Sequence, residues 1–170
     1  MELKTQRLTL IPLDTTHFRD FHSYAADPDN TRMMLFMPME SEEDSMQYLA
    51  EREAQWHAEK QLIYEFAVML DGVHIGCVSL DVLPEHCGEL GWILRRQYWG
   101  NGYAPEAAGA LIRLAAEIGI RRLIAHCDSE NTASRHVMEK LGMELNSITS
   151  GRKNRGSEEV RQECLYEKWL

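Results

Sequence analysis

The sequence predicts a single domain of mixed α/β class, an α+β arrangement, and three observations support this class. Apolar residues alternate with a period of two on both sides of Asp71-Gly72, which predicts a hairpin. A helical period of apolar residues runs through Tyr103–Ile118 and recurs after Asn131. The chain of 170 residues has no repeats and no linker, so one domain is expected to span residues 1–170.

The amino-terminal region is predicted to contain a strand followed by a helix. Leu8–Leu13 is expected to form a short strand at the edge of a sheet, because Pro12 has no backbone N–H to donate. Thr15 and Thr16 are expected to cap the helix, which should continue to about Ala26.

The next region combines a turn, an apolar segment and a second helix. Asp27–Asp29 contains a proline and is expected to be a turn. Ser41 can cap a helix with an acidic first turn, which should run to about Lys60. Met33–Pro38 between them is apolar and rich in methionine, which adapts to varied shapes. Core or dimer packing is the favoured interpretation of this segment, and a wall of a substrate site is the alternative.

Strands dominate the middle of the chain. Tyr64–Leu70 and Val73–Val82 are expected to pair across the hairpin turn, and Cys87–Leu94 should form a third strand. Gly88 and Gly91 within that strand predict either a bulge or a close approach of the backbone to a neighbour.

The carboxy-terminal half is predicted to alternate helices and strands, which brings the total to seven strands. The expected elements are a helix at Tyr103–Ile118, a strand at Arg122–Asp128, a helix between its cap Asn131 and its stop Gly142, and strands near Met143–Thr149 and Glu159–Trp169. The basic turn Arg152–Arg155 is expected to be a solvated hairpin tip.

Composition restricts the function classes. A formal net charge of −9 argues against binding along a phosphate backbone, and it suits either a cationic substrate or simple solubility. The four cysteines are spread singly, which predicts reduced core thiols and not a metal or redox framework. We find neither a secretory pattern at the amino terminus nor a membrane-spanning apolar run, so a cytoplasmic protein is expected.

The segment with the clearest chemical pattern is Arg95–Ala104, which leaves a strand, turns through two glycines and enters a helix. Free N–H groups at a helix start bind anionic oxygens, and glycine lets a phosphate approach the backbone. An ordinary strand–helix turn would show the same pattern. The chain lacks the Gly-Lys-Ser/Thr loop of nucleotide-binding proteins. It also lacks the third glycine that the dinucleotide-binding fingerprint requires, so both of those motifs are rejected.

A second cluster, Asn131 and Ser134, lies in the first turn of a later helix. Capping alone would explain these two residues. Their position is informative, however, because they follow Arg122–Asp128, the next expected strand after the glycine turn.

Together these motifs resemble those of the GNAT superfamily of acetyltransferases. Gln97–Gly102 matches the pyrophosphate motif Gln/Arg-x-x-Gly-x-Gly/Ala, and Asn131-x-x-Ser134 with Lys140–Met143 matches the second motif. With Thr5–Leu10, the chain resembles the branch that acetylates the amino termini of ribosomal proteins. The similarity covers nearly the whole chain in the expected order.

The resemblance implies a mixed, mostly antiparallel sheet of about seven strands, flanked by helices, with a splayed parallel pair that receives the pantetheine arm of acetyl-CoA. Strand backbone groups would pair with the arm, the glycine turn would hold the pyrophosphate, and Asn131 would bond the arm or its thiol end. No metal ion is expected, because no ligand spacing is present. The implied co-substrate-binding residues are Ile93, Leu94, Arg95, Gln97, Trp99, Gly100, Asn101, Gly102, Tyr103, Ala104 and Asn131.

Proton handling departs from the family pattern. Many members place a tyrosine acid seven residues after the asparagine, where this chain has Met138, which cannot donate a proton. Ser134 lies one helical turn earlier and is expected to protonate the departing thiolate instead. Glu89 is the first candidate for the base that receives the ammonium proton. Lesser candidates are Glu85, His86 and His126, and a satisfied strand residue is the favoured interpretation of His126.

The sequence therefore predicts an acetyl-CoA-dependent N-acetyltransferase acting on a primary amine, with a protein amino terminus favoured. A small amine such as a polyamine or aminoglycoside is the alternative acceptor, and a non-catalytic acetyl-CoA-binding module is a third interpretation. Neither a nucleic acid nor a membrane is an expected partner, and the protein is expected to be a monomer or a homodimer.

Overall fold

The fold is built on one eight-stranded sheet, described for all of residues 1–170 in a computed structural model. The strands lie in the order β1-β2-β3-β4-β5-β6-β8-β7, and every neighbouring pair is antiparallel except β5–β6. The strand bounds are β1 Leu3–Lys4, β2 Thr9–Pro12, β3 Ile63–Leu70, β4 Val73–Leu83, β5 Cys87–Leu94, β6 Arg122–Asp128, β7 Glu144–Arg152 and β8 Arg161–Trp169. The predicted mixed α/β class and splayed parallel pair are confirmed.

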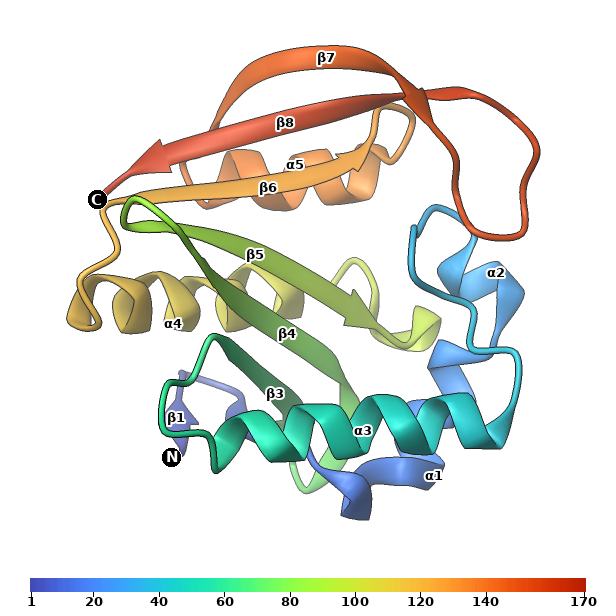
Figure 1. Cartoon of the computed structure of the whole chain (residues 1–170), viewed down its shortest axis with the longest axis vertical. Coiled ribbons are helices and arrows are strands. Elements are labelled where there is room, and N and C mark those ends of the chain that lie inside the picture. Colours follow the sequence, from blue (N-terminus) through green and yellow to red (C-terminus); the bar gives the residue numbers. More distant parts are fainter.

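Helices cover both faces of this sheet, so the protein has a hydrophobic core on each face (Figure 1). The helix bounds are α1 Phe18–Ala25, α2 Pro28–Thr31, α3 Glu42–Trp56, α4 Tyr103–Glu117 and α5 Thr132–Lys140, with 3-10 turns at Thr15–His17 and Arg96–Tyr98. The larger apolar cluster joins α4 and α5 to the sheet, and the smaller one joins α1 and α3 to the opposite face. We call the face beneath α1 and α3 the front face.

The parallel pair β5–β6 is joined only at its beginning. Its register runs from Cys87 opposite Arg122 to Glu89 opposite Ile124, and no pairing continues beyond that point. In Figure 1 the two strands lie together near the start of β5 and separate towards its end. The edge of β5 from Leu90 to Leu94 therefore faces an opening in the sheet.

The amino-terminal elements differ from the prediction in two details. The sheet gains an eighth strand, because Leu3–Lys4 pairs with Thr9 and Leu10. A strand of only two residues is too short for local periodicity to reveal it. The first helical turn is capped by Asp14, whose carboxylate accepts the N–H of Thr16, so the prediction of a threonine cap was wrong. Asp14 precedes Thr15 by one residue, and its carboxylate can accept the free backbone N–H groups at the start of this helical turn.

The region before β3 corrects two further boundaries. The predicted turn at Asp27–Asp29 is the start of the short helix α2, which has Asp27 as its cap and Pro28 in its first turn. The predicted cap Ser41 of α3 is confirmed, since its hydroxyl accepts the N–H of Asp44 at 3.0 Å. That helix ends at Trp56 and not near Lys60.

The glycines of β5 mark a close approach and not a bulge. The β4–β5 register is regular from Gly76 opposite Leu94 to Leu83 opposite Cys87. A Cβ at Gly88 would lie 2.8 Å from a methyl of Leu80, and one at Gly91 would lie 2.7 Å from the hydroxyl of Ser79. The absence of side chains there lets neighbouring groups fill the space.

The turn between β7 and β8 is not the solvated tip that its basic composition predicted. The guanidinium of Arg152 is 5% exposed, and it donates to the carbonyl of Met33 at 2.9 Å and to Glu163. Arg155 donates its guanidinium to the carbonyl of Phe36 at 2.9 Å. The hairpin thus binds carbonyls of the methionine-rich segment, a long-range contact that charge counting misses.

The methionine-rich segment itself divides between the predicted roles. Met37 is buried in the front-face core, whereas Met33 and Met34 line the cleft described below and Phe36 is 74% exposed. Core packing is therefore confirmed for part of the segment only.

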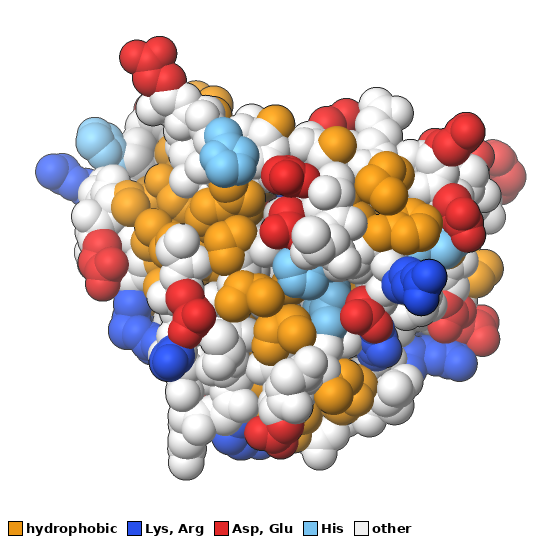
Figure 2. Space-filling view, turned by 90° about the horizontal axis from the view of Figure 1, so that it is seen from below, with side chains coloured by type: hydrophobic (Ala, Val, Ile, Leu, Met, Phe, Trp, Pro, Cys, Tyr) orange, Lys and Arg blue, Asp and Glu red, His pale blue; other side chains and the backbone are white.

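The surface carries mixed charge, and the core contains the thiols. On the face in Figure 2, acidic and basic side chains are dispersed among apolar patches. All four cysteines are buried and free, as predicted. No helix combines the length and hydropathy that crossing a membrane requires.

Candidate active site

A cleft of about 360 Å³ opens where β5 and β6 separate. It is bounded by the glycine turn at the start of α4, by one face of α5, and by Met33 and Met34. Of the predicted site residues, those that line it are Ile93, Leu94, Trp99, Gly100, Gly102, Tyr103, Ala104, Asn131 and Ser134. Arg95, Gln97, Asn101 and Glu89 lie outside its lining.

The glycine turn presents unused donors to this cleft. The backbone N–H groups of Gly100–Ala104 donate to no acceptor in the protein, and they lie at the amino-terminal end of the fifteen-residue helix α4. Gly100 and Gly102 both have φ of +77°, in the left-handed region that favours glycine. Consecutive free N–H groups and the positive end of a helix dipole together suit the oxygens of a pyrophosphate.

Side chains hold this turn from its outer side. The amide of Asn101 donates to the carbonyls of Tyr98 and Trp99, at 3.2 and 2.9 Å, which accounts for its absence from the cleft. Arg7 donates to the carbonyl of Asn101 at 3.0 Å and stacks over Tyr103, with its guanidinium carbon 4.5 Å from the ring centre. The turn is therefore fixed before any ligand binds.

Glu106 in the first turn of α4 ties Arg7 and Thr5 to the helix. Its carboxylate accepts the Arg7 backbone N–H at 2.8 Å, the Arg7 guanidinium and the Thr5 hydroxyl at 2.6 Å. Burial opposes ionisation of Glu106, but these hydrogen bonds from Thr5 and Arg7 lower its pKa. The amino-terminal segment thus braces the turn, a role that only the folded chain reveals.

The open edge of β5 offers fewer backbone groups than the predicted set. The N–H of Arg95 donates to Ile75 at 2.9 Å, so Arg95 and Ile93 direct their backbone groups towards β4. By the alternation of a strand, Leu94 and Trp92 direct theirs towards the opening, where the carbonyl of Leu94 accepts the indole N–H of Trp99 at 2.8 Å. The guanidinium of Arg95 is committed to Asp20.

The start of α5 brings a cap and a free hydroxyl to the cleft. Asn131 accepts the backbone N–H of Ser134 at 3.0 Å through its Oδ1, while its Nδ2 has no protein acceptor. The hydroxyl of Ser134 makes no hydrogen bond within the protein. Met138, at the usual tyrosine position, is fully buried in the core and cannot reach the cleft.

Comparison with known proteins identifies the family. Residues 7–144 match the model of the acetyltransferase (GNAT) domain. The chain belongs to the GNAT family of acetyltransferases. Among its relatives is the uncharacterized N-acetyltransferase YnaD of Bacillus subtilis (strain 168), which is 31% identical over 149 residues, or 84% of this chain and 82% of YnaD.

Two solved structures share the GNAT fold over almost their whole length. RimL, the ribosomal L7/L12 alpha-N-protein acetyltransferase in complex with coenzyme A, superimposes with a TM-score of 0.87 at 17% identity, covering 100% of this chain and 98% of RimL. The microcin C7 self-immunity acetyltransferase MccE, in complex with acetyl-CoA and AMP, gives 0.82 at 15% identity, covering 97% and 93%. At these identities the likeness concerns the fold alone.

In this GNAT domain, two predicted base candidates meet on the front face. Nδ1 of His126 on β6 lies 2.8 Å from Oε1 of Glu89 on β5. The hydrogen bond to Glu89 raises the pKa of His126, although burial acts in the opposite direction. The sequence favoured a satisfied strand residue for His126. Its Nδ1 has a partner in the structure, and that partner is the other base candidate, Glu89.

Asp81 on β4 lies directly opposite Glu89 in the sheet. Burial, and then the negative charge of Glu65 and Glu89, raise the pKa of Asp81 to about 6, although Arg52 opposes this shift. Two carboxylates facing each other across strands repel when both are ionised. At neutral pH the ionised Asp81 therefore destabilises the fold.

We expect Asp81→Asn to change the dependence of stability on pH. The folded pKa of Asp81 lies above its usual value of 3.8, so the folded state holds this proton more tightly and stability falls as pH rises from about 4 to about 6. The asparagine variant should lack this fall and gain on the order of 1–2 kcal/mol relative to wild type at pH 7, in urea unfolding at each pH. Asp71→Asn, at the exposed hairpin tip, is the control, and equal slopes for the two variants would contradict the assignment.

The fold also places in the cleft residues to which sequence reasoning assigned no individual role. Arg32, His136 and Lys140 line it, and Lys140 and His136 fall on the α5 face that carries Ala133 and Val137. The helical spacing of these α5 residues was available as a signal, whereas Arg32 enters through α2, which was predicted as a turn. No group of three or more His, Cys, Asp or Glu side chains is arranged to hold a metal ion.

Proposed function

We propose that this GNAT protein transfers an acetyl group from acetyl-CoA to a primary amine, with a protein amino terminus as its preferred acceptor. The observation that carries the proposal is the row of free N–H groups at Gly100–Ala104, beside the open edge of β5. Acetyl-CoA supplies an activated acetyl thioester. The turn would hold its pyrophosphate, while Leu94 and Trp92 would offer strand-like pairing to its pantetheine arm.

The remaining residues act near the point where β5 and β6 separate. Asn131 has a free Nδ2 to donate to the arm, and Ser134 has a free hydroxyl on the same helical turn. Glu89 lies at the end of the paired part of β5, on the front face. In this arrangement Ser134 donates a proton to the departing thiolate, and the Glu89–His126 pair assists the amine. Orienting both reactants contributes much of the rate enhancement, about 7–11 kcal/mol in favourable cases.

A second hollow supports an acceptor larger than a small amine. It measures about 560 Å³, is lined mainly by polar and charged residues, and is formed by the β7–β8 turn and α2. It shares Arg32, Met33 and Glu130 with the first cleft, so the two are adjacent. Such an extension suits the polar backbone that follows an amino terminus, and the acceptor of RimL is a protein amino group, as its name states.

A panel of acceptors tests this proposal. Peptides with free amino termini, polyamines and aminoglycosides are incubated with acetyl-CoA, and release of the CoA thiol is measured. We expect peptides to be turned over with the highest kcat/KM, and the same peptides with blocked amino termini to be inactive. Preference for polyamines or aminoglycosides would assign the small-amine function instead, and no turnover with any class would leave a binding module.

A further inference from the structure

The Glu89–His126 pair has the geometry of an oriented base. Nδ1 of His126 is engaged by Glu89, whereas Nε2 has no partner in the protein. A carboxylate that accepts the Nδ1 hydrogen fixes the imidazole tautomer, so that Nε2 carries a lone pair and can accept a proton. The side chains of His126 and Glu89 are 30% and 37% exposed, so a substrate can reach them.

Resting on the proposed function, we propose that His126 is the general base that deprotonates the acceptor amine, and that Glu89 is the positioning residue that orients it. The sequence had favoured Glu89 as the base, with His126 as a lesser candidate.

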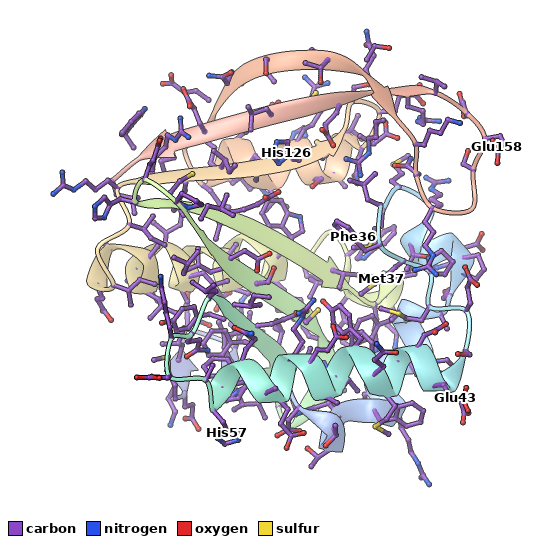
Figure 3. The ribbon with its side chains drawn as sticks, in the orientation of Figure 1. Phe36, Met37, Glu43, His57, His126 and Glu158 are labelled. Atoms are coloured by element: carbon purple, nitrogen blue, oxygen red, sulfur yellow. The ribbon has the colours of Figure 1, made fainter.

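The pair lies where the two parallel strands part. Glu89 and Ile124 form the last residue pair between β5 and β6. His126 follows Ile124 by two residues along β6. Figure 3 shows His126 on the part of β6 that has separated from β5. Two residues along a strand advance about 7 Å on the same face, so His126 lies on the front face beside the opening, while neither His126 nor Glu89 lines the cleft of 360 Å³ itself.

Three charged groups act on the pKa of His126. Glu89 faces it from β5, Glu163 from β8 and Arg152 from β7, and the two carboxylates raise the pKa of His126 while Arg152 lowers it. Arg152 is itself paired with Glu163, which limits its influence. A base whose pKa lies nearer to the working pH than that of a carboxylate is better matched to an ammonium group.

The proton step balances without any further reactant. Nε2 takes one proton from the substrate ammonium group, whose N–H electron pair becomes the lone pair that attacks the acetyl carbonyl. The imidazole becomes an imidazolium, which remains paired with the Glu89 carboxylate and later releases its proton to water. The carbon–nitrogen bond forms and the carbon–sulfur bond breaks. The leaving sulfur takes its proton from water, or from the Ser134 hydroxyl, which regains a proton from water.

The decisive variant is His126→Asn. An asparagine amide can donate to Glu89 from the position of Nδ1, but it has no group at the position of Nε2. If His126 is the base, kcat with the acceptor should fall by about 10²–10⁴-fold, with unchanged affinity for acetyl-CoA. His57→Asn, an exposed histidine at the end of α3, is the matched control and should keep wild-type activity. Full activity of His126→Asn would overturn the assignment.

Glu89→Gln separates the two roles by pH. The amide can still accept from Nδ1, but it removes the negative charge that raises the pKa of His126. The rising limb of the kcat/KM profile should therefore persist and move to lower pH, with a reduced plateau. NMR titration of the free protein should show the His126 pKa falling in parallel. If the rising limb of the kcat/KM profile disappeared while the pKa of His126 stayed unchanged, Glu89 would be the base. Absence of wild-type turnover would overturn the proposed function, and this assignment with it.

Discussion

Gly102→Val is expected to abolish detectable binding of acetyl-CoA in calorimetry, while the protein remains folded. Gly102 caps α4 with φ of +77°, a conformation that costs a residue with a Cβ roughly 1–2 kcal/mol and a β-branched residue more. Because the nearest atom to an added Cβ is the guanidinium of Arg7 at 3.5 Å, the substitution causes no collision in the core. The turn must instead change conformation, and the N–H groups of Gly100–Ala104 then no longer converge on one site.

A control with the same backbone strain makes this result interpretable. Gly119, just beyond the other end of α4, has φ of +84° and open space around its Cβ position. Gly119→Val should lose a similar amount of stability but bind acetyl-CoA with wild-type affinity. Unchanged affinity in a folded Gly102→Val protein would remove the glycine turn as the phosphate site.

The sequence predicted those parts of the fold that local signals determine. The bounds of Cys87–Leu94 and Arg122–Asp128 agree with β5 and β6, because apolar periodicity and turn residues define both ends. The caps Ser41 and Asn131 are also confirmed, since a cap bonds only to the next helical turn. Burial of Arg152 was missed because its acceptor is the carbonyl of Met33, far away in the sequence.

The site divides in the same way. The glycine turn is one continuous segment, so its position at the start of α4 followed from the sequence. The Glu89–His126 pair depends on β5 and β6 being parallel neighbours in one particular register, which no local pattern encodes. The bracing of the turn by Arg7 and Glu106 likewise joins residues 99 positions apart. Contacts between side chains that are distant in the sequence could therefore be identified only from the structure.

Ser134→Ala is expected to lower kcat by about 10²–10⁴-fold, the usual contribution of a positioned proton donor. The structure separates this role from helix capping, because Asn131 bonds the backbone N–H of Ser134 and not its hydroxyl. The alanine variant therefore keeps the cap and the helix. Since the turn at Gly100–Ala104 is untouched, affinity for acetyl-CoA should change little.

Ser134→Thr provides the rescue, because it returns a hydroxyl at the same position on α5 and should restore most of the lost kcat. Met138→Tyr is not an alternative route, since Met138 is fully buried and a tyrosine there would overpack the core. Leaving-group dependence gives the sharpest test. With a thioester whose thiol is more acidic, the departing thiolate needs less protonation, so the deficit of Ser134→Ala should shrink. A deficit that stays constant across thioesters would mean that Ser134 orients the arm and that water donates the proton.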